Sequence, residues 1–120
     1  MKPSHLVKGD LGERLAVDFL MKQGLTVVIT NYNSRVGEID IICRDKKELV
    51  FVEVRLRSNQ NYGSAAETVS IHKQRKVTKA AQFFLLQNPS LNRLFMRFDV
   101  IGIDAQNNIE WIKGAFQAAV

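Results

Sequence analysis

The chain has 120 residues and a formal net charge of +5 at pH 7, with 17 Lys and Arg against 12 Asp and Glu. This length fits one domain, residues 1–120, of which residues 1–8 are expected to form a flexible tail. No apolar run approaches the ~20 residues of a membrane helix, no secretory signal opens the chain, and a single cysteine excludes a disulfide framework, so we expect a cytoplasmic protein without membrane attachment.

Hydrophobic periodicity divides the chain into helices and strands. Two helices are expected, at residues 10–23 and 71–87. Five strands are expected, at residues 26–32, 37–44, 49–56, 97–104 and 109–113. Short turns make the first three strands an antiparallel meander, and the second helix can return the chain so that the fourth strand runs parallel to one of them. The sequence therefore predicts an α/β fold, with a mixed central sheet of about five strands flanked by helices.

Two strands carry acidic residues at positions that bring them together. Side chains alternate between the two faces of a strand. Glu38 and Asp40 therefore share one face of the GEIDII strand, and Glu53 and Arg55 share one face of the FVEVR strand. The same alternation puts Ile39 and Ile41 together on the opposite face. If residues 46–47 form the turn, Asp40 lies opposite Glu53, and Glu38 lies opposite Arg55.

Opposed carboxylates repel each other, and their Cβ atoms would be only ~5 Å apart. Between apolar strands, desolvation adds to the cost. A divalent cation would convert this repulsion into attraction, and oxygen ligands suit Mg²⁺ or Mn²⁺. The alternative is a solvated strand face on which Glu38 pairs with Arg55, and a register slip of one residue would separate Asp40 from Glu53. The pattern alone leaves both interpretations open.

The motifs GEID and FVEVR resemble the core of the PD-(D/E)XK nuclease superfamily, in which an Asp and an acid-x-Lys motif hold Mg²⁺ for phosphodiester hydrolysis. More closely, the chain resembles the bacterial YraN family, and the arrangement is also similar to archaeal Holliday-junction resolvases. The stretches that carry the YraN resemblance are residues 9–16, 37–40, 51–57, 73–76 with 80–81, 97–100 and 111–116. They cover almost the whole chain and imply a restriction-endonuclease-like three-layer fold.

The resemblance also implies roles for individual residues. Asp40 would be the principal metal ligand and Glu53 the second, with the backbone carbonyl of Val54 completing the set. Glu13, on the first helix, would bind a second metal or orient a metal-bound water. Arg55 occupies the position of the usual catalytic lysine.

Arginine at position 55 is a departure from the motif, because a guanidinium is always protonated and cannot act as a base. Arg55 can still position water and stabilise negative charge on the phosphate, and the metal can generate hydroxide from bound water. The resemblance thus implies a Mg²⁺- or Mn²⁺-dependent endonuclease acting on DNA, including branched or damaged DNA. The alternatives are a non-catalytic nucleic-acid-binding protein on the same fold and an interaction protein with surface acids.

Basic side chains gather at the start of the second helix and favour a nucleic-acid partner, most simply DNA. The expected nucleic-acid-binding residues are Arg57, Lys73, Gln74, Arg75, Lys76 and Lys79. Basic residues at a helix start oppose the helix dipole, which favours a functional reading over a merely solvated face. Nucleases that cut two strands often act as dimers, so a homodimer is compatible with the sequence. We expect Asp99 to be structural and Cys43 to be an inert core residue.

Overall fold

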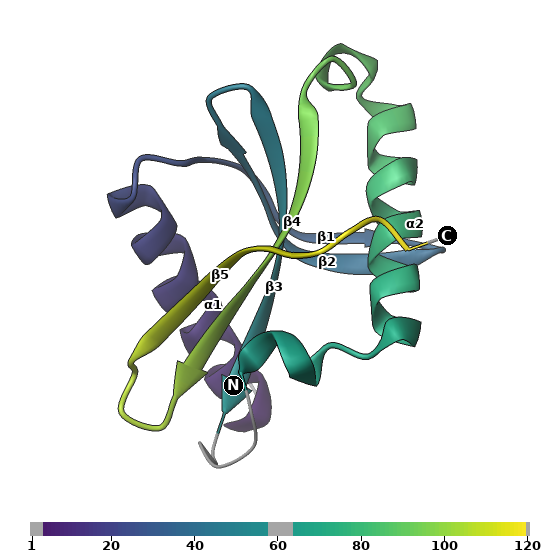
Figure 1. Cartoon of the computed structure of the whole chain (residues 1–120). Helices are drawn as coiled ribbons and strands as arrows, with labels where there is room; N and C mark the ends of the chain where they lie inside the picture. The colour runs from purple at the N-terminus through teal and green to yellow at the C-terminus, as the bar shows by residue number, and fades with distance from the viewer. Residues whose placement is uncertain (1–3, 58–63, 120) are drawn as a thin grey trace.

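A computed structural model describes residues 4–57 and 64–119 (Figure 1). Within these residues the chain forms two α-helices, five β-strands and two short 3₁₀-helices. In chain order they are α1 (Ser4–Lys22), β1 (Thr26–Ser34), β2 (Gly37–Asp45), β3 (Glu48–Arg57), η1 (Ala65–Thr68), α2 (Ile71–Gln87), η2 (Pro89–Leu91), β4 (Phe95–Asp104) and β5 (Ile109–Phe116). The first helix begins at Ser4, so residues 4–8 are helical, whereas we expected a flexible tail there.

The five strands form one mixed sheet whose spatial order, β1-β2-β3-β4-β5, is also their order in the chain. Strands β1, β2 and β3 pair antiparallel, as the expected meander requires. Strand β4 runs parallel to β3, since α2 returns the chain across the sheet, and β5 pairs antiparallel with β4. The expected α/β architecture is therefore confirmed.

The two helices cover opposite faces of the sheet and make it the middle of three layers (Figure 1). Strand β3 is apolar on both sides, because Val50 and Val52 pack with α1 while Phe51 packs with α2. On the α1 side the helix contributes Ala16 and Leu20 to the core. A strand that is buried on both faces holds its backbone rigidly, and β3 carries FVEVR.

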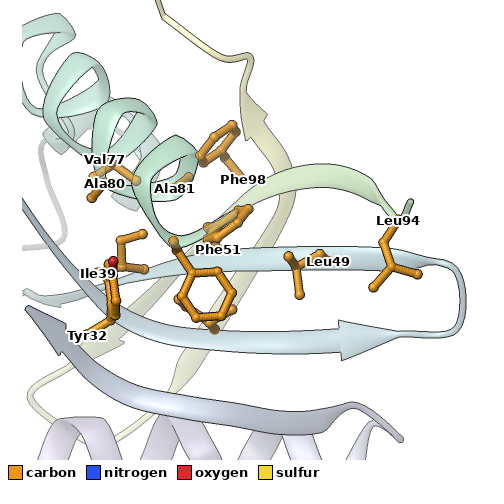
Figure 2. Close-up of a cluster of buried hydrophobic side chains, with 11 residues drawn as sticks. Tyr32, Ile39, Leu49, Phe51, Val77, Ala80, Ala81, Leu94 and Phe98 are labelled. Carbon is orange, nitrogen blue, oxygen red and sulfur yellow. The ribbon is translucent and has the colours of Figure 1, made fainter. Parts of the chain in front are cut away.

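Aromatic rings dominate the core between α2 and the sheet (Figure 2). Phe51 lies in the middle, with its ring centroid 5.5 Å from that of Phe98 and 6.3 Å from that of Phe84. Tyr32 meets Phe84 edge to face at 5.2 Å. The side chain of Ser70 accepts a hydrogen bond from the Lys73 amide and begins α2 one residue later, at Ile71. The aromatic contacts hold α2 against the sheet, and the Ser70 cap sets where the helix begins.

Strands β1 and β2 bend away from the rest of the sheet and reach α2 (Figure 1). Asn31 has a φ of 52°, and the cross-strand register places it opposite Asp40. Beyond this point Ile39 packs with α2, although Ile41 packs with α1. The expectation that Ile39 and Ile41 share a face was therefore wrong, because the β1–β2 pair bends toward α2 between these two residues.

Candidate active site

The candidate site lies where β2 and β3 separate. Their ladder has the register expected from the turn and ends at the pair Ile41 and Val52. One residue further along, side chains replace the ladder. The Val54 amide donates to Asp40 Oδ2 at 2.8 Å, and the Asp40 amide donates to Glu53 Oε2 at 3.4 Å. Asp40 and Glu53 therefore lie opposite each other, as expected, at the point where β2 and β3 separate. We call this point, formed by Asp40 on β2 and by Glu53 and Val54 on β3, the fork.

Both carboxyl groups are withdrawn from water. Glu53 is only 2% exposed and Asp40 is half-buried. Burial, followed by the charge of Asp40, raises the pKa of Glu53 to about 7. Burial also raises the pKa of Asp40, against the lowering effects of the Val54 hydrogen bond and the charges of Lys73 and Arg55. The pair therefore resists carrying two negative charges near neutral pH, which is typical of functional carboxylates.

A lysine from α2 completes this cluster. The Nζ atom of Lys73 lies 3.4 Å from Glu53 Oε1, and its side chain is 35% exposed. Lys73 is in the first turn of α2, whose start is fixed by Ser70. The sequence predicted Lys73 to contact nucleic acid, but it did not show that its ammonium group would contact a carboxylate of the fork.

The donor set fits a hard divalent cation. Asp40 and Glu53 supply carboxylate oxygens, and the Val54 carbonyl points to the β2 side of β3, as its amide does. Among the described side chains, no three His, Cys, Asp or Glu residues gather closely enough to form a metal site. Mg²⁺ commonly binds through one or two carboxylates and keeps several waters. Two acids and a carbonyl therefore suit Mg²⁺ or Mn²⁺, which keep several water ligands. They suit less well a metal ion whose ligands all come from the protein.

Glu13 reaches the same end of the sheet without joining the carboxylate pair. Its Oε1 atom accepts a hydrogen bond from Asn31 Nδ2 at 2.8 Å. A Cβ added to the preceding Gly12 would lie 2.6 Å from a Leu56 methyl carbon, so this turn of α1 lies against the end of β3. The flanking pairs Thr30–Ile41 and Tyr32–Ile39 place Asn31 opposite Asp40. The side-chain amide of Asn31 therefore links Glu13 on α1 to the part of β1 that lies beside Asp40.

Arg55 is held differently from the expectation. Its Nε atom is buried and has no hydrogen-bond partner among the described residues. No ion pair joins it to Glu38 within the described part of the chain, so the pairing of Glu38 with Arg55 that the alternative, solvated-face interpretation required is not found. The ladder between β2 and β3 ends before these two positions would face each other.

The other predicted nucleic-acid residues divide into exposed and structural groups. Three basic side chains on α2 are exposed and available to a partner; they are Arg75, Lys76 and Lys79. Gln74 instead donates from Nε2 to the Val69 carbonyl at 3.1 Å and supports the start of the helix. Arg57, at the end of β3, lies 3.7 Å from Glu110 and lines a cavity of about 500 Å³ between α1 and the β4–β5 turn.

Asp99 and Cys43 have the roles that the sequence favoured. Asp99 is fully buried and accepts hydrogen bonds from the side chains of Arg97 and Trp111 and from the Gly114 amide. These four bonds satisfy its carboxylate and tie β5 to β4. Cys43 is buried beneath α1, and burial, followed by the Asp99 charge, raises the pKa of its thiol to about 12. Neither residue belongs to the fork.

Asn31 is the site residue that the sequence analysis missed. Asparagine is uncommon within strands and tolerates the left-handed region. Its place inside TVVITNYNS was therefore a signal of a left-handed residue within β1. Lys73 offered no comparable signal, because only the folded chain shows which lysine of α2 turns inward.

The five-stranded mixed sheet between α1 and α2 is consistent with a three-layer restriction-endonuclease-like fold, and the fork lies at the centre of that sheet. The family model described as "Uncharacterised protein family UPF0102" matches residues 12–103. The chain is 43% identical over 112 residues to a UPF0102 protein of Legionella pneumophila, covering 92% of this chain and 95% of that protein.

Two further relatives show the same extent of similarity. A UPF0102 protein of Saccharophagus degradans is 47% identical over 112 residues, which cover 93% of this chain and 94% of the relative. One from Vibrio cholerae is 46% identical over 110 residues, with 90% of each chain covered. The protein therefore belongs to the UPF0102 family, and the resemblance to YraN proteins is confirmed.

Proposed function

We propose that this protein is a Mg²⁺- or Mn²⁺-dependent endonuclease of the PD-(D/E)XK type that hydrolyses phosphodiester bonds in DNA. The observation that carries the proposal is the buried pair of Asp40 and Glu53, which face each other beside the Lys73 ammonium group. Leaving two such acids without a cation is unfavourable, and their raised pKa values express that cost.

In this proposal each residue has a defined task. Asp40 and Glu53 would hold the cation, together with the Val54 carbonyl, and a cation bound there would supply a water of lowered pKa and Lewis acidity toward the phosphate. Glu13, which accepts a hydrogen bond from the Asn31 side chain, orients a water at the site. Arg55 has an unsatisfied buried Nε atom, and its positive charge stabilises a phosphate bound at the fork.

The exposed cations of α2 support a nucleic-acid substrate. Arg75, Lys76 and Lys79 leave the same helix that brings Lys73 to the carboxylates. A DNA backbone that crosses α2 would therefore meet positive charge next to the metal site.

We place this activity in the cytoplasm. The described part of the chain contains no helix of the length and apolarity that crossing a membrane would require. Cleavage of both strands would use two copies of the site, and thus a homodimer.

The experiment compares the parent with Asp40→Asn, Glu53→Gln and a control, Asp18→Asn, which changes an exposed acid of α1. Linear, nicked, single-stranded and branched DNA are incubated with Mg²⁺ or Mn²⁺, and calorimetry measures Mn²⁺ binding. We expect the site variants to lose Mn²⁺ binding and to cleave at least roughly 100-fold more slowly, while the control matches the parent. Equal cleavage by parent and site variants would refute the proposal.

A second candidate is a non-catalytic nucleic-acid-binding protein on the same fold. Arg55 in place of the usual lysine favours it, together with the exposed cations of α2. This candidate predicts DNA binding that needs no metal and weakens steeply with salt. Tight binding by the parent without cleavage of any DNA in the panel would favour this candidate over the nuclease.

A further inference from the structure

Among the side chains that the structure describes, the cation closest to the carboxylate pair comes from α2 and not from β3. Lys73 Nζ lies 3.4 Å from Glu53 Oε1, whereas Arg55 makes no ion pair within the described part of the chain. We propose that Lys73 is a catalytic residue that takes the role assigned by resemblance to position 55. This inference rests on the proposed nuclease function and assigns the charge at the reaction centre to another element.

The backbone explains why Lys73 occupies this position. Ser70 Oγ accepts from the Lys73 amide at 3.1 Å, which sets the residue in the first helical turn. On the helix, Lys73 is one turn before Val77 and shares its inward face, and Val77 is fully buried in the α2-side core. The lysine side chain therefore starts toward the sheet and ends at the fork.

The two cations differ in what they can do there. An ammonium group has three donors on a flexible stem, so one hydrogen bond to Glu53 leaves two donors for substrate. The Arg55 guanidinium is planar, and its buried Nε atom is unsatisfied. Lys73 can therefore contact Glu53 and a phosphate oxygen at once, and Arg55 serves as a more distant positive charge.

In the reaction, Lys73 keeps its proton and holds a non-bridging phosphate oxygen. The oxygen of water forms a bond to phosphorus, and the bond to the leaving oxygen breaks with its electron pair on that oxygen. A proton from the attacking water passes to solvent, and the leaving oxygen takes a proton from solvent. The ammonium group stabilises the negative charge that grows on the phosphate during this exchange.

The charge of Lys73 also affects cation binding directly. Its ammonium group stands 3.4 Å from Glu53 Oε1. A positive group that does not itself bind the metal repels a divalent cation at the same carboxylates. Removing its charge while keeping its length should therefore tighten Mn²⁺ binding, by roughly three- to tenfold. This readout is independent of cleavage.

The test uses Lys73→Met, Lys73→Arg, Arg55→Met and a matched control, Lys22→Met, which alters an exposed lysine at the far end of α1. Calorimetry measures Mn²⁺ affinity, and single-turnover assays with Mn²⁺ measure DNA cleavage and KM. We expect Lys73→Met to bind Mn²⁺ more tightly, to cleave roughly 100- to 1,000-fold more slowly with little change in KM, and to lose more rate than Arg55→Met. Lys73→Arg should recover part of the rate, and Lys22→Met should match the parent.

Parental cleavage rates in Lys73→Met, or a larger loss in Arg55→Met, would overturn the assignment. Loss of Mn²⁺ binding in Lys73→Met would also overturn it, because the lysine would then support the shape of the site and not the reaction. If the parent cleaves no DNA, the proposed function fails and Lys73 has no catalytic role. The Mn²⁺ measurement then still tests whether the charge of Lys73 lies beside the bound metal. Unchanged affinity in Lys73→Met refutes a charge beside the metal, and tighter binding supports it.

Discussion

At the scale of single residues, the fork sets function against stability. Glu53 is nearly inaccessible to water and faces another acid, and its two polar contacts, with the Asp40 amide and the Lys73 ammonium group, are both 3.4 Å long. Its folded-state pKa is about 7, compared with an ordinary value of 4.5. A carboxyl whose pKa is raised by folding stabilises the protein below its unfolded pKa and loses that contribution as pH rises toward the folded pKa. The contribution of Glu53 to the stability of the folded state should therefore be least favourable at alkaline pH.

We predict that Glu53→Gln is more stable than the parent at pH 8 by roughly 2–3 kcal/mol, because the amide removes a buried charge. The difference should shrink as pH falls from about 7 to 4.5, and at pH 4 the two proteins should agree within roughly 0.5 kcal/mol. Urea denaturation at several pH values measures this. A Glu53→Gln variant that is less stable than the parent at pH 8, without added metal, would contradict the prediction.

Some of this site could be predicted from the sequence, and some could not. The opposition of Asp40 and Glu53 follows from a two-residue turn, in which Lys46 adopts a φ of 58° and fixes the register. The reversal between Ile39 and Ile41 does not follow, because it depends on how the β1–β2 pair bends toward α2. The position of Lys73 depends on how α2 packs on the sheet, which periodicity alone does not determine.

At the scale of elements, the β1–β2 hairpin is docked on α2 through Gly37. A Cβ built on Gly37 would lie 2.9 Å from the carbonyl oxygen of Lys76, which belongs to the helix backbone. Only glycine permits this approach without a shift of the strand or the helix. The glycine of GEID therefore has a packing role.

We predict that Gly37→Ala lowers the free energy of unfolding by about 1–3 kcal/mol, since neither backbone can move easily. The control is Val36→Ala, which shortens the exposed neighbouring side chain and should cost about 0.5 kcal/mol or less. Urea denaturation compares the two variants with the parent. Equal stabilities for Gly37→Ala and the parent would show that the hairpin and helix can separate freely.

The expected elements were predicted well where local patterns determine them. The helix at residues 71–87 was found with the same limits, because a cap residue and Pro89 bound it. Strand β4 was expected to run parallel to another strand, and β3 is that strand. The start of α1 was placed too late, since residues 4–8 lack the apolar periodicity on which the prediction depended.

At the scale of the whole molecule, positive charge gathers at both ends of the sheet. The β2–β3 turn carries Lys46 and Lys47, while α2 exposes Lys76 and Lys79 at the end that holds the fork. Glu53 is six residues from Lys47 along β3, or about 20 Å at the rise of a strand. Net charge alone would treat these two pairs of lysines as equivalent, whereas a bound DNA at the fork would contact only the α2 pair.

We predict that Lys76→Gln with Lys79→Gln weakens DNA binding and reduces the slope of log Kd against log salt by about 2. Lys46→Gln with Lys47→Gln removes the same charge at the distant turn and should leave the slope unchanged. Fluorescence anisotropy between low and physiological salt measures both. Equal slopes for the two double variants would show that DNA responds to net charge and not to the α2 surface.

The buried thiol of Cys43 gives this molecule an internal reporter. It is the single sulfhydryl of the chain, it lies on β2 three residues after Asp40, and its raised pKa keeps it protonated and unreactive in the folded state. Because Cys43 packs in one core with Ala16 and Leu20 of α1, an alkylating reagent can modify it only when α1 lifts from the sheet or the sheet itself opens. The rate of alkylation therefore measures how often this core opens, in the unmodified protein and without an introduced label.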